Sequence, residues 1–376
     1  MKRAVLAALL AAPLAAALFA CSSTSGPKPA DLPRIEHAAK VRSVWSASVG
    51  DGERFVFTPS LADGSVFTAA HDGTVTRLDA ASGRRLWRVS AGTQLSAGAG
   101  TDGNIVAVAN EDGDVVALDA KTSERRWGAH VSSEVIAAPA VGSDLVLVRS
   151  IDNRLFAFGA QDGKRRWVYQ RAPSSLIIRT PAGVAIQGDL AFAGFAGGRL
   201  VAVALSNGGV RWEATVAVPK GGTELERVTD VVGDPAVQGR EVCAATYQGR
   251  VGCYETASGR QVWARDISSL SGVGLDPRYA FVADEKGAVQ AFDRTNGRSV
   301  WKQDKLANRQ LSQPQAVGEF VAVGDFEGYV HFLARDTGAF VARYEVGGGR
   351  VAAPPQALPG GVLVQTQSGR MAALAL

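Results

Sequence analysis

The side chains that could carry catalysis or hold a metal ion are few and scattered in this 376-residue sequence. The four histidines, His37, His71, His130 and His331, lie far apart along the chain. A metal centre needs several such ligands close together, so this distribution predicts none. The C-x-x-C-H motif that attaches haem is absent as well. We therefore expect no catalytic residues, no metal site and no cofactor.

Three aspartates, Asp79, Asp119 and Asp293, occupy one position of a repeated sequence, just before an Ala/Arg-x-[ST] turn. A carboxylate at that position can accept hydrogen bonds from the amides of the turn. Since each aspartate belongs to a different repeat, the three do not form an active-site pair. We predict a structural role for them.

The two cysteines outside the N-terminal region, Cys243 and Cys253, flank a turn in EVCAATYQGRVGCYE. A three-residue loop in that turn would place them opposite each other on paired strands. In an oxidising compartment they could then form a cross-strand disulfide. The alternative is two buried thiols at positions that do not face each other, and the sequence leaves both open.

Repeated β-hairpin segments supply the elements that position these residues. In DGDVVALDAKTSERRW, from Asp112, a turn dipeptide precedes alternating apolar residues, a second turn and a third strand. Related segments begin at Asp72, Asp152, Gly197, Gln248, Lys286 and Glu327. Fifteen residues after each start stand Trp87, Trp127, Trp167, Trp212, Trp263 and Trp301, with Ala342 in the seventh copy. Such a hairpin cannot bury its apolar face alone, so the copies must stack.

An eighth copy begins at Ser368, and the sequence ends before its tryptophan position. The one remaining tryptophan, Trp45 in VRSVW, supplies the missing strand. We therefore predict an all-β fold, an eight-bladed β-propeller of four-stranded blades over residues 41–376. The N-terminal strand carrying Trp45 completes the last blade and closes the ring.

The N-terminal region predicts export and membrane anchoring. Residues 1–20 combine two basic residues with an apolar run broken at Pro13, which is typical of a signal peptide rather than a spanning helix. Leu18–Cys21 resembles the lipobox of bacterial lipoproteins, so we predict lipidation of Cys21 and a flexible tether over 21–40. Ser22 favours the periplasmic face of the outer membrane. The alternative is an ordinary secreted protein.

Charge gives no support for a nucleic-acid partner. The sequence holds 40 basic and 36 acidic residues, and removal of the first twenty takes away two of the basic ones. No basic run interleaved with aromatic residues occurs, so we predict that the protein does not bind nucleic acid.

Two neighbouring links between repeats are longer than the others. The interval from the tryptophan to the next repeat is 30 residues after Trp167 and 36 after Trp212, against 23 to 26 in four other links. The surplus lies in Arg171–Pro181 and Val218–Asp234, which fall on the same face of the predicted ring. Insertions of this kind often carry function in repeat folds.

The repeat phrase Ala/Asp-x-x-[ST]-Gly-x-x-x-Trp is similar to that of the quinoprotein dehydrogenases, which bind pyrroloquinoline quinone and calcium on the axis of the ring. Those enzymes have long insertions that build the cofactor site, and often a pair of adjacent cysteines. The loops here are short, and Cys243 and Cys253 lie ten residues apart. The resemblance therefore indicates architecture, and a quinoprotein dehydrogenase is the weaker alternative.

The lipobox, the tether and the eight repeats together resemble the BamB family, lipoproteins of the machine that assembles β-barrel proteins in Gram-negative outer membranes. Leu176–Arg179 matches an apolar-x-apolar-Arg motif of that family. GTELERVTDVVGDP, from Gly222, resembles the family's second loop, with Asp230 at its first aspartate. Val232 stands where the family has a second acidic residue.

This resemblance implies a non-catalytic scaffold that aids the assembly and insertion of β-barrel proteins. The expected partners are the periplasmic POTRA domains of the barrel subunit BamA, the rest of the complex, and unfolded outer-membrane proteins. The contact residues carried over are Leu176, Ile178, Arg179 and Asp230. Two alternatives stay open: a scaffold for another envelope complex, and packing of these loop residues onto the adjacent blade.

Overall fold

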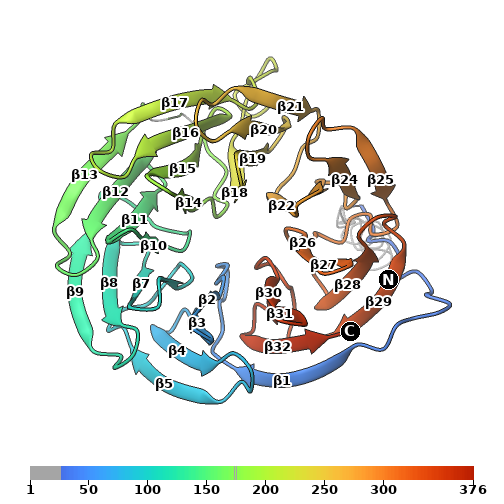
Figure 1. Ribbon diagram of the computed structural model, residues 1–376, viewed down its shortest axis with the longest axis horizontal. Helices are drawn as coiled ribbons and strands as arrows, with labels where there is room; N and C mark the ends of the chain where they lie inside the picture. The colour runs from blue at the N-terminus through green and yellow to red at the C-terminus, as the bar shows by residue number, and fades with distance from the viewer. Residues whose placement is uncertain (1–26, 173, 175) are drawn as a thin grey trace, which may run out of the picture.

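Eight four-stranded antiparallel sheets form a closed ring (Figure 1). The computed structural model describes residues 27–172, 174 and 176–376. The predicted signal peptide and the predicted lipidation site Cys21 lie outside these residues. Within the described ranges, no helix is long and apolar enough to cross a membrane. The ring confirms the predicted eight-bladed β-propeller.

The strands of the first four blades run from the axis outward. Blade 1 contains β2 (Ser60–Ala62), β3 (Ser65–Ala69), β4 (Thr74–Asp79) and β5 (Arg85–Ser90). Blade 2 contains β6 (Gly100–Thr101), β7 (Ile105–Ala109), β8 (Asp114–Asp119) and β9 (Arg125–His130). Blade 3 contains β10 (Ala140–Gly142), β11 (Leu145–Ser150), β12 (Arg154–Gly159) and β13 (Arg165–Gln170). Blade 4 contains β14 (Val184–Gln187), β15 (Leu190–Phe195), β16 (Arg199–Ala204) and β17 (Val210–Thr215).

The other four blades follow the same plan. Blade 5 contains β18 (Val231–Gln238), β19 (Glu241–Thr246), β20 (Val251–Glu255) and β21 (Gln261–Arg265). Blade 6 contains β22 (Val273–Leu275), β23 (Tyr279–Ala283), β24 (Val289–Asp293) and β25 (Ser299–Gln303). Blade 7 contains β26 (Gln315–Val317), β27 (Phe320–Gly324), β28 (Tyr329–Ala334) and β29 (Phe340–Glu345). Blade 8 contains β30 (Gln356–Leu358), β31 (Gly361–Gln365), β32 (Arg370–Ala375) and β1 (Arg42–Ser48).

Burial follows the position of each strand within its blade. In blade 3, β12 is buried over five of its six residues, because both of its faces pack against neighbouring blades. The outer strand β13 keeps only Trp167 buried and exposes Arg165 and Arg166. A propeller blade therefore has a characteristic sequence pattern: the middle strands are long apolar runs, and the outer strand alternates buried and exposed residues.

Each tryptophan of the repeat joins its blade to the next one. Trp127 donates a hydrogen bond from Nε1 to the carbonyl oxygen of Ala160, 33 residues later, at 2.8 Å. Its ring also covers Gly163, where a Cβ atom would come within 2.6 Å of the indole. Gly163 has φ +63°, so the turn needs glycine for its backbone as well as for space. This contact explains why glycine and tryptophan recur together in the repeat.

Trp45 makes the same contact across the seam of the ring. β1 pairs with β32, and Trp45 lies opposite Ala373. The indole donates to the carbonyl oxygen of Ala80 in blade 1 at 3.0 Å and covers Gly83. The prediction that the N-terminal strand completes the last blade is confirmed.

The recurring aspartates hold the turns between the third and fourth strands. Asp119 accepts hydrogen bonds from the amides of Lys121 at 2.8 Å and Thr122 at 2.7 Å. Asp79 and Asp293 accept equivalent bonds from turn amides in their own blades. The predicted structural role of these three aspartates is confirmed.

Replacing Asp119 by asparagine tests that role through pH. The hydrogen bond from Arg126, with those from the turn amides, lowers the pKa of Asp119 to about 2. A lowered carboxyl pKa stabilises the fold above the unfolded pKa, near 4, and this contribution is lost as pH falls toward 2. Because Arg126 is half-exposed, we expect only about 1 kcal/mol at pH 6.

Urea unfolding of the native and Asp119→Asn proteins between pH 2 and pH 6 measures this contribution. The two curves should converge as pH falls. The exposed Asp304 provides a control, since Asp304→Asn should shift stability little at either pH. A constant difference between native and Asp119→Asn proteins over the whole range would contradict the ionic role of the carboxylate.

Candidate partner-binding site

The two insertions lie on the same side of the ring, which we call the loop face. This face carries the links between blades and the turns between the second and third strands; the opposite side is the turn face. The first insertion links β13 to β14, and the second links β17 to β18. In Figure 1 the two links follow one another around the ring at blades 3 to 5. The sequence prediction of a shared face is confirmed.

The first insertion presents one apolar and one charged side chain. Leu176 is 47% exposed. The Arg179 side chain is 51% exposed, and its Nη2 lies 2.5 Å from Glu134 Oε2 and 3.4 Å from Glu111 Oε1. These two carboxylates orient the guanidinium while leaving half of it open to solvent. Such a planar cation, held in place beside an exposed leucine, is suited to pair with a carboxylate of a partner.

Ile178 is partly buried, and its position is fixed by the second insertion. Its amide donates a hydrogen bond of 2.7 Å to Asp230 Oδ2, while Asp230 Oδ1 accepts one of 3.3 Å from the amide of Gly197. Only 6% of Asp230 is exposed, and burial raises the pKa of its carboxyl group. Asp230 therefore positions the first insertion from within the ring, and its role as a contact residue stays a prediction.

Val232 is likewise a core residue. It is 1% exposed and belongs to the apolar cluster between blades 5 and 6. An acidic side chain here would be buried in apolar surroundings. Val232, where the family has an acidic residue, therefore contributes to the apolar core of blade 5. It does not change the charge of the surface.

The second insertion presents two exposed apolar residues that the sequence analysis did not single out. Leu225 is 70% exposed and Val218 is 62% exposed. The tip is held by a reciprocal cap, in which Glu226 Oε2 accepts from the amide of Thr223 at 3.2 Å and Thr223 Oγ1 accepts from the amide of Glu226 at 3.2 Å. The T-x-x-E spacing was visible in the sequence and could have identified this capped turn.

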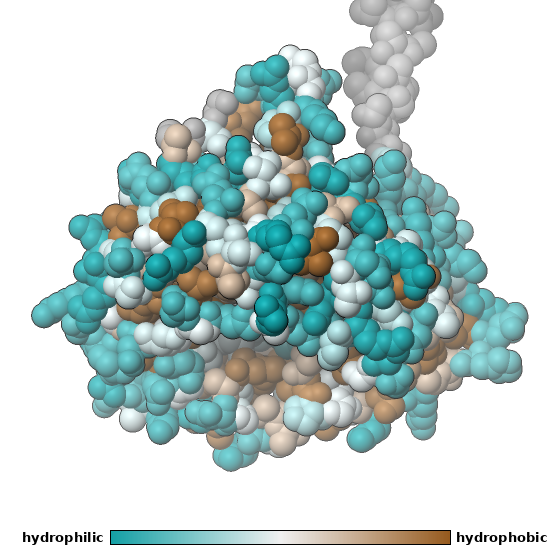
Figure 2. Space-filling view, turned by 45° about the horizontal axis from the view of Figure 1, so that its top comes forward, coloured by the Kyte–Doolittle hydropathy of each residue, from teal (hydrophilic) through white to brown (hydrophobic). Residues whose placement is uncertain are grey.

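Together these residues form the loop surface, by which we mean Leu176, Ile178, Arg179, Val218 and Leu225. Figure 2 shows hydrophobic side chains interspersed with hydrophilic ones on the part of the molecule that rises above the ring. Apolar anchors within a polar surround are typical of protein–protein interfaces. The arrangement is suited to binding a partner.

A cavity of about 570 Å³ opens at the axis beside this surface. Its lining is mixed, and includes Arg54, Arg179, Arg350, Asp234 and the partly exposed Leu270. Calcium in a protein takes six to eight oxygen ligands. Among the described residues, no three His, Cys, Asp or Glu side chains gather in a way that could hold a metal ion. The side-chain donors of the described residues therefore do not fit the calcium of a quinoprotein dehydrogenase.

The histidines make separate contacts. His71 Nδ1 lies 2.7 Å from the carbonyl oxygen of Leu95, and His130 Nδ1 lies 3.1 Å from Asp114. His331 is fully buried, with Nε2 2.8 Å from Asp325. These contacts lie in blades 1, 2 and 7, so the three histidines do not gather at one site.

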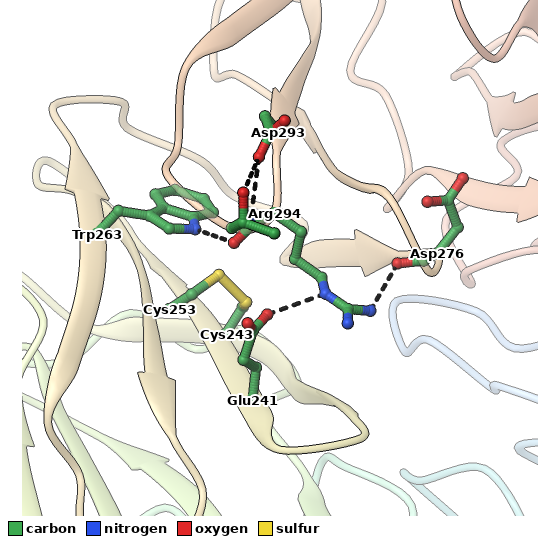
Figure 3. The surroundings of a disulfide bond; sticks show 8 residues. Glu241, Cys243, Cys253, Trp263, Asp276, Asp293 and Arg294 are labelled. Atoms are coloured by element: carbon green, nitrogen blue, oxygen red, sulfur yellow. Dashed lines mark hydrogen bonds and ion pairs between the residues drawn. A yellow bond between two sulfur atoms is a disulfide. The ribbon is translucent and has the colours of Figure 1, made fainter.

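A disulfide braces blade 5, directly after the second insertion. Cys243 and Cys253 lie opposite each other on β19 and β20, the register that a three-residue loop requires, and their sulfur atoms are bonded. Figure 3 shows the disulfide beside Trp263, whose Nε1 donates to the carbonyl oxygen of Arg294 at 2.6 Å. Arg294 in turn pairs with Glu241 at 2.9 Å. The crosslink therefore lies at the contact between blades 5 and 6.

Thiol titration of the unfolded protein checks the disulfide. Reductant should release two thiols that do not react without it. Replacing both Cys243 and Cys253 by alanine should lower the free energy of unfolding by about 2–3 kcal/mol, because the short loop is no longer closed in the unfolded chain. Reaction of both thiols before reduction would contradict the crosslink.

Comparison with known proteins gives a consistent result. A family model described as "Outer membrane protein assembly factor BamB" matches residues 39–95 and 71–303. The chain is 45% identical over 360 residues to a Bordetella pertussis protein named outer membrane protein assembly factor BamB, covering 94% of this chain and 93% of that one.

Solved structures agree on the architecture. The crystal structure of BamB from Moraxella catarrhalis matches with a TM-score of 0.81 at 23% identity, over 90% of this chain and 100% of that chain. A quinohemoprotein alcohol dehydrogenase from Pseudomonas putida matches with a TM-score of 0.67 at 15% identity, over 89% of this chain and 76% of that one. At these identities the two structures support the fold alone.

Proposed function

Because the chain belongs to the BamB family, we propose that it acts as a non-catalytic scaffold in the assembly of outer membrane proteins. Its relatives bear the name of assembly factors over more than nine-tenths of both chains. In this role the protein binds the periplasmic POTRA domains of the barrel subunit BamA through the loop surface. It belongs to the same complex as that subunit, and it helps unfolded β-barrel proteins to assemble and insert.

The observation that carries the proposal is how residues 176–179 of the first insertion are held. The amide of Ile178 is held by the buried Asp230, and Arg179 is held by Glu111 and Glu134. Leu176 remains 47% exposed beside them. A segment whose backbone and charge are fixed from within the ring, while its apolar side chain faces outward, loses little conformational freedom on binding. This preorganisation favours a docking role over simple packing of the loop.

The same proposal places the protein at the periplasmic face of the outer membrane, anchored by lipid on Cys21. More than one acyl chain gives stable anchoring, since each buried CH₂ contributes about 0.8 kcal/mol. Mass spectrometry of the N-terminal peptide tests this directly, because acylation adds the mass of the chains to the peptide that begins at Cys21.

Affinity purification of the full-length lipoprotein from gently solubilised outer membrane tests the function. Recovery of a barrel protein with POTRA domains supports the proposal. Recovery of a different envelope complex instead would contradict the assembly role and leave the propeller fold unaffected. Absorbance of a bound quinone in the same purified protein would favour the dehydrogenase alternative. Only the similarity of fold supports that alternative.

A further inference from the structure

The described part of the predicted tether does not hang free of the ring. The amide of Ala39 donates a hydrogen bond of 2.9 Å to the carbonyl oxygen of Val341 on β29. Further toward the N-terminus, Arg343 Nη2 donates one of 3.2 Å to the carbonyl oxygen of Pro33. In Figure 1 this segment runs along the outside of β29 before it enters β1.

A second group of contacts holds the segment on the link between β25 and β26. The amide of Ala30 donates to the carbonyl oxygen of Ala307 at 2.9 Å. The side-chain amide of Asn308 donates to the carbonyl oxygen of Lys28 at 3.1 Å. Residues 28–39 are therefore fixed at both ends, and we call them the strap.

Arg309 is the buried centre of this contact. Its side chain is 3% exposed, its Nε lies 2.7 Å from Asp325 Oδ2, and its Nη2 pairs with Glu327. The remaining nitrogen, Nη1, donates to the carbonyl oxygen of Ala30 at 3.0 Å. Buried charged donors need partners, so the strap supplies the acceptor that completes this guanidinium.

The strap also changes the face from which the chain leaves the ring. Arg42, at the start of β1, pairs with Ala375, while Ser48 pairs with Arg370 beside the turn between β31 and β32 on the loop face. The chain therefore meets β1 at the turn face. Ala307 and Asn308 lie in a link between blades, on the loop face. The strap carries the chain across the rim of blade 7 from one face to the other.

We propose that the strap holds the loop face of blades 6 and 7 next to the lipid bilayer. This inference rests on the proposed anchor at Cys21. Lys28 lies seven positions after Cys21, a span of at most about 25 Å, whereas Val41 lies twenty positions after it, a span of at most about 70 Å. Contact of the strap with the ring thus shortens the free segment between Cys21 and the ring to roughly a third. This segment then starts from the loop face.

The consequence concerns how the ring meets its partner. The insertions that form the loop surface leave the ring at blades 3 to 5, two and three blade positions from the strap and on the same face. A partner in the same membrane therefore finds the loop surface at a restricted distance. A short linking segment with a fixed direction raises the effective concentration of the two partners above the value that a long segment gives.

Energy transfer to the lipid surface tests the orientation. The full-length lipidated protein is placed in liposomes with an acceptor on the headgroups and a donor on Lys286→Cys or Arg298→Cys. Both residues are exposed and belong to blade 6, in the loop-face turn before β24 and the turn-face turn before β25. Transfer should be stronger from position 286. Equal transfer from both positions would overturn the inference.

A variant that releases the strap supplies the matched comparison. Ala30→Pro removes the amide donor, and Asn308→Gly removes the side-chain amide while tolerating the φ of +58° at that position. Both changes leave Arg309 and Asp325 in place. The difference between positions 286 and 298 should fall by at least half in the double variant; an unchanged difference would contradict the role of the strap.

Two further readouts separate this inference from the function on which it rests. The amide of Ala39, which donates to the carbonyl oxygen of Val341, should exchange slowly in the native protein and rapidly in the double variant. Slow exchange together with equal transfer would overturn the membrane orientation alone. Absence of acyl chains on Cys21 would overturn both the proposed anchor and the inference built on it.

Discussion

Replacing Arg179 by glutamate is expected to weaken binding of the barrel subunit's POTRA domains by roughly 30- to 1,000-fold. A hot-spot residue at an interface contributes about 2–4 kcal/mol, and the loop surface offers one oriented cation beside one exposed leucine. A glutamate would also face Glu134 and Glu111, so the new side chain would be repelled from the position that the arginine holds. Titration of the purified proteins measures the loss.

The stability of the ring should change little in the same variant. Arg179 is half-exposed, and exposed ion pairs contribute about 0–1 kcal/mol. Arg179→Gln removes the charge without repulsion and should show an intermediate loss of binding. Arg165→Glu, at an exposed position on the outer strand of blade 3, is the matched control and should bind like the native protein. A fall in stability as large as the fall in binding would show that Arg179 is structural.

Replacing Trp45 by alanine is expected to open the ring at its seam. The indole is 8% exposed, covers Gly83 and donates to Ala80 in blade 1. Removing a buried tryptophan typically costs 3–5 kcal/mol, so the urea midpoint should fall steeply. Because β1 is tied to β32 only within blade 8, loss of this contact should also let β1 separate.

Trp127→Ala provides the control, since Trp127 is buried to the same extent and makes the same contact within the continuous part of the chain. Both variants should lose similar stability. Hydrogen exchange should differ: the amides of β32 should become exposed before global unfolding in Trp45→Ala and not in Trp127→Ala. Equal protection of β32 in the two variants would contradict closure by the N-terminal strand.

The ring and its closure could be predicted because they are periodic. Tryptophan recurs at one position of the repeat, and the count leaves Trp45 for the last blade. The same period identified the two insertions, because the interval from a tryptophan to the next repeat is longer there than in the other links. Physical reasons for the recurrence, such as the indole over Gly163, became visible only in the structure.

The site was predicted less completely, because it depends on contacts between segments that share no period. Asp230 matches a motif of its family, yet its side chain turns inward to Ile178. Leu225 is exposed because a capped turn lifts it away from the ring. The strap was predicted as part of a flexible tether from its composition. Composition cannot reveal that the carbonyl oxygen of Ala30 accepts a hydrogen bond from the buried Arg309.

The central claim is that the loop surface docks on the barrel subunit, and photo-crosslinking in cells tests it most directly. A photoreactive amino acid replaces Leu176, which is 47% exposed in the first insertion, or Val168, which is 44% exposed on the outer strand of the same blade. Irradiation should join the barrel subunit to the protein carrying the probe at 176 and leave the probe at 168 without that adduct. Equal adducts from both positions, or none from position 176, would contradict the docking surface.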